Sequence, residues 1–162
     1  MYIHITLKKK INMESKAAAF IISNEWANSP ICGTHNGYVA VPPTNKYHGK
    51  SYWDIDDIRV HGGITFSEPV INGEKTFMSK ILYKPEVVGK RNSLLDRAEF
   101  ITDNTNIGNY WWIFGFDTFH NNDDPLNWDK ESVIQETKSL MEQLIDEQGN
   151  AITSYRLTYK ST

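Results

Sequence analysis

Two histidines and an aspartate stand where strands of the predicted fold are expected to end. His61 precedes Gly62 and Gly63, and His120 follows Asp117 by three residues. An imidazole can donate a hydrogen bond to a phosphate or carbonyl oxygen, carry a proton near neutral pH or ligate a metal. Adjacent glycines let a ligand or another backbone come close because they have no side chains. These residues are therefore candidates for a binding or active site.

The carboxylate of Asp117 follows directly on the most hydrophobic segment of the chain, residues 110–116. Loops at the ends of buried strands are a common place for a site in an α+β protein. Asp117 could orient His120, accept a hydrogen bond from a ligand hydroxyl, or share a cation with that histidine. The structural alternative is that Asp117 caps a turn, His120 faces water and the glycines make a hairpin turn beside a half-exposed His61.

A metal site is a weaker alternative. His61, Asp117 and His120 supply two imidazoles and a carboxylate, and Asp123 or Asp124 could add an oxygen ligand. Their spacing matches no zinc motif, and the sequence contains neither HExxH nor a CxxC pair. No metal and no cofactor is therefore assigned from the sequence, and no motif assigns a reaction.

The composition is that of a globular protein. The chain has 162 residues, of which 40% are hydrophobic and 12% aromatic, enough for the core of one domain. A formal charge of -3 offers no basic surface for duplex DNA or RNA, and no GxxxxGK[ST] or GxGxxG loop is present. The lone Cys32 excludes an intrachain disulfide and a cysteine metal cluster. With no apolar run of the ~20 residues that cross a bilayer, we expect a cytoplasmic protein without a membrane partner.

Hydrophobic periodicity predicts a single α+β domain with a mainly antiparallel sheet, an N-terminal helix and a long C-terminal amphipathic helix. The first helix is expected over residues 14–27, where three alanines favour it, and the second over 130–148, capped by Asp129 and ended by Gly149. The strands are expected at 37–42, 58–61, 64–66, 110–116 and 151–159, with a hairpin joining 70–71 to 76–78.

The remaining segments are expected to be irregular. Residues 44–57 are polar and predict a loop or a single helical turn, and residues 83–109 predict a mobile insertion with a short helix near 93–100. Met13 is an alternative start, in which case residues 1–12 are an extension outside the fold.

Exposed aromatic side chains offer two further alternatives. Stacking faces for an aromatic base, with cations for a phosphate, could come from Tyr38, Tyr47, Trp53, Trp111, Lys50, Arg59 and Arg91, although such aromatics usually fill the core. Trp53 and Trp128 could instead anchor a host protein. A strand edge or the C-terminal helix could support a homodimer.

Three segments resemble a group of short uncharacterised proteins of bacteriophages and of the bacteria that carry them. The segments are GYVAVP at 37–42, VHGGITF at 60–66 and WWIFGFD at 111–117 with His120 after it. In that group a Cys and an Ala precede the last histidine, where this chain has Thr118 and Phe119, and one residue fewer precedes the glycine; the difference argues against a catalytic cysteine. The resemblance spans about residues 37–144 and implies an accessory protein of phage or mobile-element origin, without an established activity.

The leading hypothesis is a small-molecule-binding accessory protein that sequesters a nucleotide-like signal and so counteracts host defence. The first alternative is a hydrolase in which His61 or His120 acts as general base or metal ligand and Asp117 orients it. The second is an inhibitor of a host protein. The predicted ligand-binding residues are His61, Gly62, Gly63, Thr65, Asp117, His120 and Tyr38.

Overall fold

The computed structural model describes residues 17–25, 29–72 and 89–161, with side chains described as far as Ile145. The expected extension at 1–12, the strand at 76–78 and the first part of the expected insertion, residues 83–88, lie outside these ranges. In the described part of the chain, no helix has the length and apolar character needed to cross a membrane.

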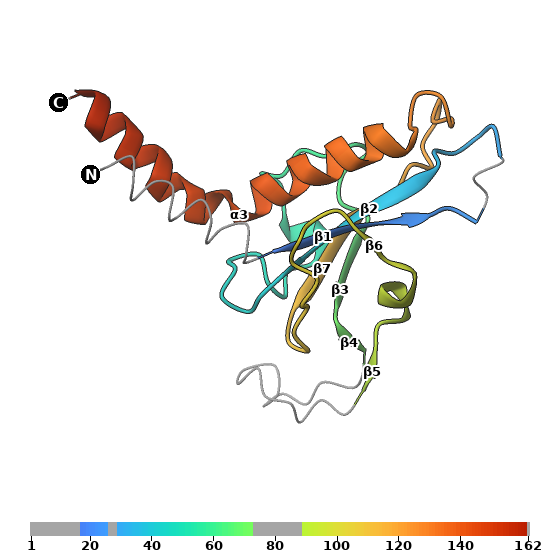
Figure 1. Cartoon of the computed structure of the whole chain (residues 1–162), viewed down its shortest axis with the longest axis horizontal. Helices are drawn as coiled ribbons and strands as arrows, with labels where there is room; N and C mark the ends of the chain where they lie inside the picture. The colour runs from blue at the N-terminus through green and yellow to red at the C-terminus, as the bar shows by residue number, and fades with distance from the viewer. Residues whose placement is uncertain (1–16, 26–28, 73–88, 162) are drawn as a thin grey trace.

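An antiparallel sheet with a long helix across one face forms the body of the protein (Figure 1). Within the described residues it has five strands in the order β3-β7-β2-β1-β6, and each neighbouring pair is antiparallel. The predicted α+β class with a mainly antiparallel sheet is confirmed. The strands are β1 (Ala18–Ser23), β2 (His35–Val41), β3 (Phe66–Pro69), β6 (Glu99–Phe100) and β7 (Trp112–Phe116).

The other elements are short, apart from the helix. A separate ladder pairs β4 (Ile71–Asn72) with β5 (Lys90–Arg91). Single 3-10 turns form η1 (Tyr52–Asp54), as expected for the polar segment, and η2 (Ser93–Arg97), within the expected short helix. The helix α3 (Lys130–Ser161) begins where the sequence predicts and continues well beyond the predicted end.

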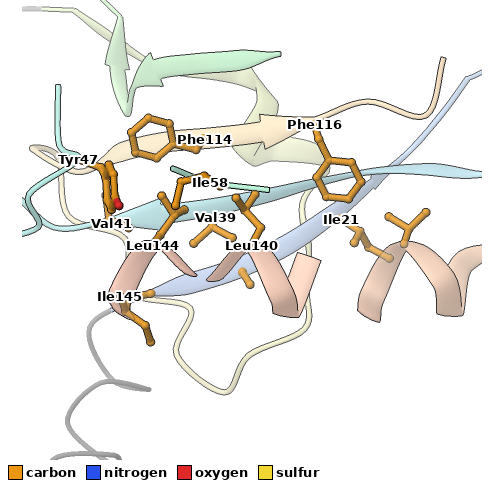
Figure 2. Close-up of a cluster of buried hydrophobic side chains, with 13 residues drawn as sticks. Ile21, Val39, Val41, Tyr47, Ile58, Phe114, Phe116, Leu140, Leu144 and Ile145 are labelled. Atoms are coloured by element: carbon orange, nitrogen blue, oxygen red, sulfur yellow. The ribbon is translucent and has the colours of Figure 1, made fainter. Parts of the chain in front are cut away.

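Both faces of the sheet are buried. On the α3 side, Phe114 and Phe116 of β7 pack with Val39 of β2 and with Leu140 and Leu144 of the helix (Figure 2). On the opposite side, the buried core contains Phe20, Tyr38, Ala40 and Ile113, covered by Leu94 and Ile107 from the expected insertion. The central strands are therefore hydrophobic almost without interruption, because neither face meets water.

The predicted N-terminal helix at 14–27 is wrong over its described part, where residues 18–23 form β1. Its side chains alternate between the two cores: Ala19 and Ile21 face α3, whereas Phe20 and Ile22 face the other side. The pairing with β2 over six residues stabilises the strand. Three alanines favour a helix by propensity, and tertiary packing overrides that weak preference.

The predicted C-terminal strand at 151–159 is also wrong, because α3 runs through Gly149 to Ser161. A glycine inside a helix costs only about 1 kcal/mol relative to alanine, so it does not have to end the helix. An alternating hydrophobic pattern does not make a strand by itself, because a strand also needs a partner for its backbone hydrogen bonds.

The predicted strand pair 58–61 and 64–66 is replaced by a loop that leads into β3. Ile58, Val60 and Ile64 point toward the core under α3, which explains their strand-like alternation. Their backbone is held by helix side chains instead of a ladder: the Arg59 amide donates to Gln143 Oε1 at 2.7 Å, and the His61 amide donates to Glu136 Oε1 at 3.2 Å. This loop therefore places His61 beside α3.

Candidate functional site

The rings of His61 and His120 lie side by side, although 59 positions separate them in the sequence. Their centroids are 5.1 Å apart. Gly62 and Gly63 make the turn after His61 with φ angles of +69° and +81°, which glycine adopts freely. A Cβ at residue 62 would overlap the His120 ring. A glycine is therefore required at position 62 for two reasons: the positive φ of the turn and the close approach of the His120 ring.

The carboxylate shared by the two histidines belongs to Asp123. Its two oxygens each lie 2.9 Å from His61 Nε2, and Oδ2 accepts the His120 backbone N–H at 2.8 Å. The turn from residue 120 to 123 is closed by the Asp123 amide, which donates to the His120 carbonyl at 2.9 Å. Only 5% of Asp123 is exposed. We call His61, His120 and Asp123 the histidine–carboxylate cluster.

Asp117, the carboxylate that the sequence predicts, contacts one of the two histidines. Its Oδ1 lies 3.3 Å from His120 Nδ1 and also accepts the Phe119 N–H at 3.1 Å. It therefore both caps the turn and faces an imidazole. Asp124 caps the next turn, since its Oδ1 accepts the N–H groups of Leu126 and Asn127.

The Nδ1 atom of His120 is buried and unsatisfied. Although Asp117 Oδ1 is 3.3 Å away, Nδ1 has no hydrogen-bond partner among the described residues. Asp123 Oδ2 is 3.8 Å away from the same nitrogen. This polar atom thus faces two carboxylates without a bond to either.

Trp128 packs against one face of the His61 ring. Its ring stacks on His61 with centroids 4.0 Å apart and an interplanar angle of 30°. The sequence pointed to Trp128 as an exposed anchor for a protein partner, but the side chain is half-buried and packs against the core under α3. Trp53, the other predicted anchor, is 81% exposed.

The connection between β1 and β2 fixes the turn that carries His120. The fully buried Thr118 accepts the Gly33 N–H at 2.8 Å through its carbonyl and donates its hydroxyl to the His35 carbonyl at 2.8 Å. The Thr34 amide donates to the Trp128 carbonyl at 2.9 Å. Two residues of one connection thus hold both the turn and the tryptophan, an arrangement that no local sequence signal indicates.

Tyr38 and Thr65 lie outside the histidine–carboxylate cluster. Tyr38 stacks on Phe20 in the core on the face opposite α3, with centroids 5.4 Å apart. It also borders a separate surface cavity of about 240 Å³, together with Arg97 and Phe119. The Thr65 amide donates to Gly115 at the start of β3, and its side chain is exposed.

Burial shifts two titratable groups on β2, close to this scaffold. It lowers the pKa of His35, and the nearby Lys130 charge lowers it further. It raises the pKa of the Tyr38 hydroxyl, against the opposing effect of a hydrogen bond with Asn36. Both shifts favour the uncharged form. The His35 ring contacts Thr34 and lies outside the histidine–carboxylate cluster, so a substitution of His35 can serve as a control for substitutions of His61 and His120.

Comparison with other proteins adds no family and no activity to this geometry. No family model, curated protein or solved structure matches the chain.

Proposed function

We propose that this protein binds a small, nucleotide-like molecule at the surface above the histidine–carboxylate cluster. The observation that carries the proposal is the convergence of His61 and His120, whose side chains keep 23% and 29% of their surface exposed beside a buried carboxylate. A Cβ at Gly63 would meet no atom within 4 Å, so there is open space beside this glycine, two residues after His61. We propose further that this binding sequesters a host defence signal, the role expected of an accessory protein of phage or mobile-element origin.

The contacts of His61 indicate how such a ligand is recognised. An ionised carboxylate only accepts hydrogen bonds, so without a bound cation Nε2 of His61 is the donor to Asp123 and, in the neutral ring, Nδ1 keeps its lone pair. That lone pair can accept from a ligand hydroxyl or amino group. The stacked Trp128 ring limits rotation of the imidazole, so its orientation is set before a ligand arrives.

Calorimetric titration with a panel of nucleotides and cyclic dinucleotides tests this proposal. We expect at least one to bind, with an affinity lowered about 10- to 100-fold in His61→Gln and in His120→Gln, the effect of losing one or two hydrogen bonds. The matched control is His35→Gln, whose imidazole contacts Thr34 Oγ1 at 2.8 Å outside the cluster. Absence of heat with every member of the panel, or an equal loss in the control, would contradict the proposal.

Hydrolysis is the second candidate function, and the Asp123–His61 pair favours it. A buried carboxylate that holds an imidazole fixes its tautomer and stabilises the imidazolium formed when the ring takes a proton from water. Asp123, 5% exposed and bonded to His61 Nε2, meets that description. Asp117, predicted to orient whichever of the two histidines acts as the base, lies beside His120.

Release of phosphate or nucleoside monophosphate from the same panel tests this candidate. If the protein turns over a nucleotide, Asp123→Asn should lower kcat by about 10²- to 10⁴-fold, the usual contribution of positioned acid–base groups. The exposed Asp96→Asn on η2 should leave turnover unchanged. Binding without turnover in the wild-type protein would exclude hydrolysis and leave the first proposal standing.

A further inference from the structure

Three donor atoms of the histidine–carboxylate cluster lie close enough together to be candidate ligands of one metal ion. One ligand atom from each of His61, His120 and Asp123 lies within 4.8 Å of the others. Asp123 Oδ2 is 2.9 Å from His61 Nε2 and 3.8 Å from His120 Nδ1. Tetrahedral bonds of about 2.0–2.2 Å place neighbouring donors about 3.3 Å apart, between these two distances. The three donor atoms are thus near enough to one another for a single ion once they adjust to its bond lengths.

The unsatisfied Nδ1 of His120 is an independent observation in favour of an ion. A buried polar atom with no partner costs about 1–3 kcal/mol, and such atoms in folded proteins are rare enough to require a reason. This one faces Asp117 Oδ1 at 3.3 Å and Asp123 Oδ2 at 3.8 Å. A cation bonded to Nδ1 would satisfy the nitrogen and balance the two negative charges beside it.

The donor chemistry selects the kind of metal. Two imidazoles and one carboxylate suit Zn²⁺ and other divalent first-row transition metals, whereas Mg²⁺ and Ca²⁺ prefer sites made of oxygen atoms. We infer that His61, His120 and Asp123 bind one such ion, with Zn²⁺ the best fit, and that the partly exposed side of the cluster leaves a coordination position for water or a ligand oxygen.

Asp117 and Glu136 have supporting places around this site. Asp117 approaches the His120 ring, and Glu136 of α3 accepts the His61 backbone N–H at 3.2 Å. Asp117 lies on the side of Nδ1, the nitrogen that faces the ion, so it adds negative charge beside the cation, and Glu136 holds the backbone that carries His61. Asp123 is thus the carboxylate that binds the ion. Asp117, the carboxylate of the ligand set expected from the sequence, does not bind it directly.

The site also deepens the proposed function, because an ion with an open position can bind a phosphate oxygen that the surrounding carboxylates would otherwise repel. That ligand step depends on the proposed function; the ion itself does not. If the protein binds Zn²⁺ but no nucleotide of the panel, the metal site stands and the proposed ligand is rejected. Nucleotide binding by a chelator-treated protein that takes up no Zn²⁺ would do the reverse.

Calorimetric titration of tag-free, chelator-treated full-length protein with ZnCl₂ tests the inference. We expect one ion per chain, with affinity reduced at least about 100-fold in His61→Gln, His120→Gln and Asp123→Asn, and about 10-fold in Asp117→Asn. The control His35→Gln should bind Zn²⁺ as the wild type does, and MgCl₂ should give no comparable heat. Co²⁺ should give the visible absorption of a four- or five-coordinate ion, lost in His120→Gln.

Far-UV circular dichroism of each variant separates loss of a ligand from loss of the fold. If Asp123→Asn fails to fold, the two histidine variants decide the matter by themselves. The inference is overturned if the wild type takes up no Zn²⁺, or if folded His61→Gln and His120→Gln both bind it as tightly as the wild type.

Discussion

Asp123→Ala is expected to lower the free energy of unfolding by about 2 to 4 kcal/mol, in addition to its effect on the site. The buried carboxylate accepts from His61 Nε2 and from the backbone N–H of His120, and the alanine satisfies neither donor. The His120 amide belongs to the turn itself, so its loss of a partner strains the segment that carries the second imidazole. Urea denaturation followed by tryptophan fluorescence measures the change.

The exposed Asp96→Ala is the matched control for Asp123→Ala. Asp96 lies on the surface of η2, and a surface substitution of this kind changes stability by no more than about 0.5 kcal/mol. Asp123→Asn should fall between the two, because an amide oxygen still accepts the His120 N–H. A loss below about 1 kcal/mol in Asp123→Ala would show that this carboxylate is not a structural support of the turn.

Phe114→Ala is expected to lower the free energy of unfolding by about 3–5 kcal/mol, the cost of removing a buried aromatic ring and leaving a cavity. Phe114 is fully buried in β7, opposite Val39 of β2, in the core between the sheet and α3 (Figure 2). The sheet and the helix are rigid at this point, so the surroundings can close around the gap only in part. Thermal and urea denaturation both report the loss.

The control for this substitution is Trp53→Ala, which removes a larger ring at a position that is 81% exposed. A stability change within about 0.5 kcal/mol is expected there, because the side chain loses little contact with the protein. Equal losses for the two aromatic residues would contradict the assignment of β7 to the core.

The two substitutions act on parts that the fold connects. The buried β7 ends at Phe116, and Thr118, two residues later, is bound to the β1–β2 connection, which also holds Trp128. The turn that carries His120 therefore starts from a rigid strand. Support of this kind fixes a site before ligand or metal arrives, which reduces the entropy lost on binding.

The sequence alone determined the α+β class, the strands around residues 37–41 and 112–116, and the start of α3. It did so because continuous apolar runs and a 3.6-residue period mark buried strands and a packed helix. It also pointed to His61, Asp117 and His120, since polar side chains directly after buried strands are exposed but firmly held. It failed for residues 18–23, where alanine propensity favours a helix and burial on both faces of a sheet decides for a strand.

Only the tertiary structure decided which carboxylate the histidines share. Asp117 and Asp123 both lie three positions from His120, so spacing cannot distinguish them; the left-handed residue Asn122, with φ of 72°, closes the turn beside Asp123. The stacking of Trp128 on His61 depends on hydrogen bonds with a segment more than ninety positions away in the chain. Contacts between residues so far apart in the chain form when separate elements pack on one core. A local pattern of residue types therefore cannot predict them.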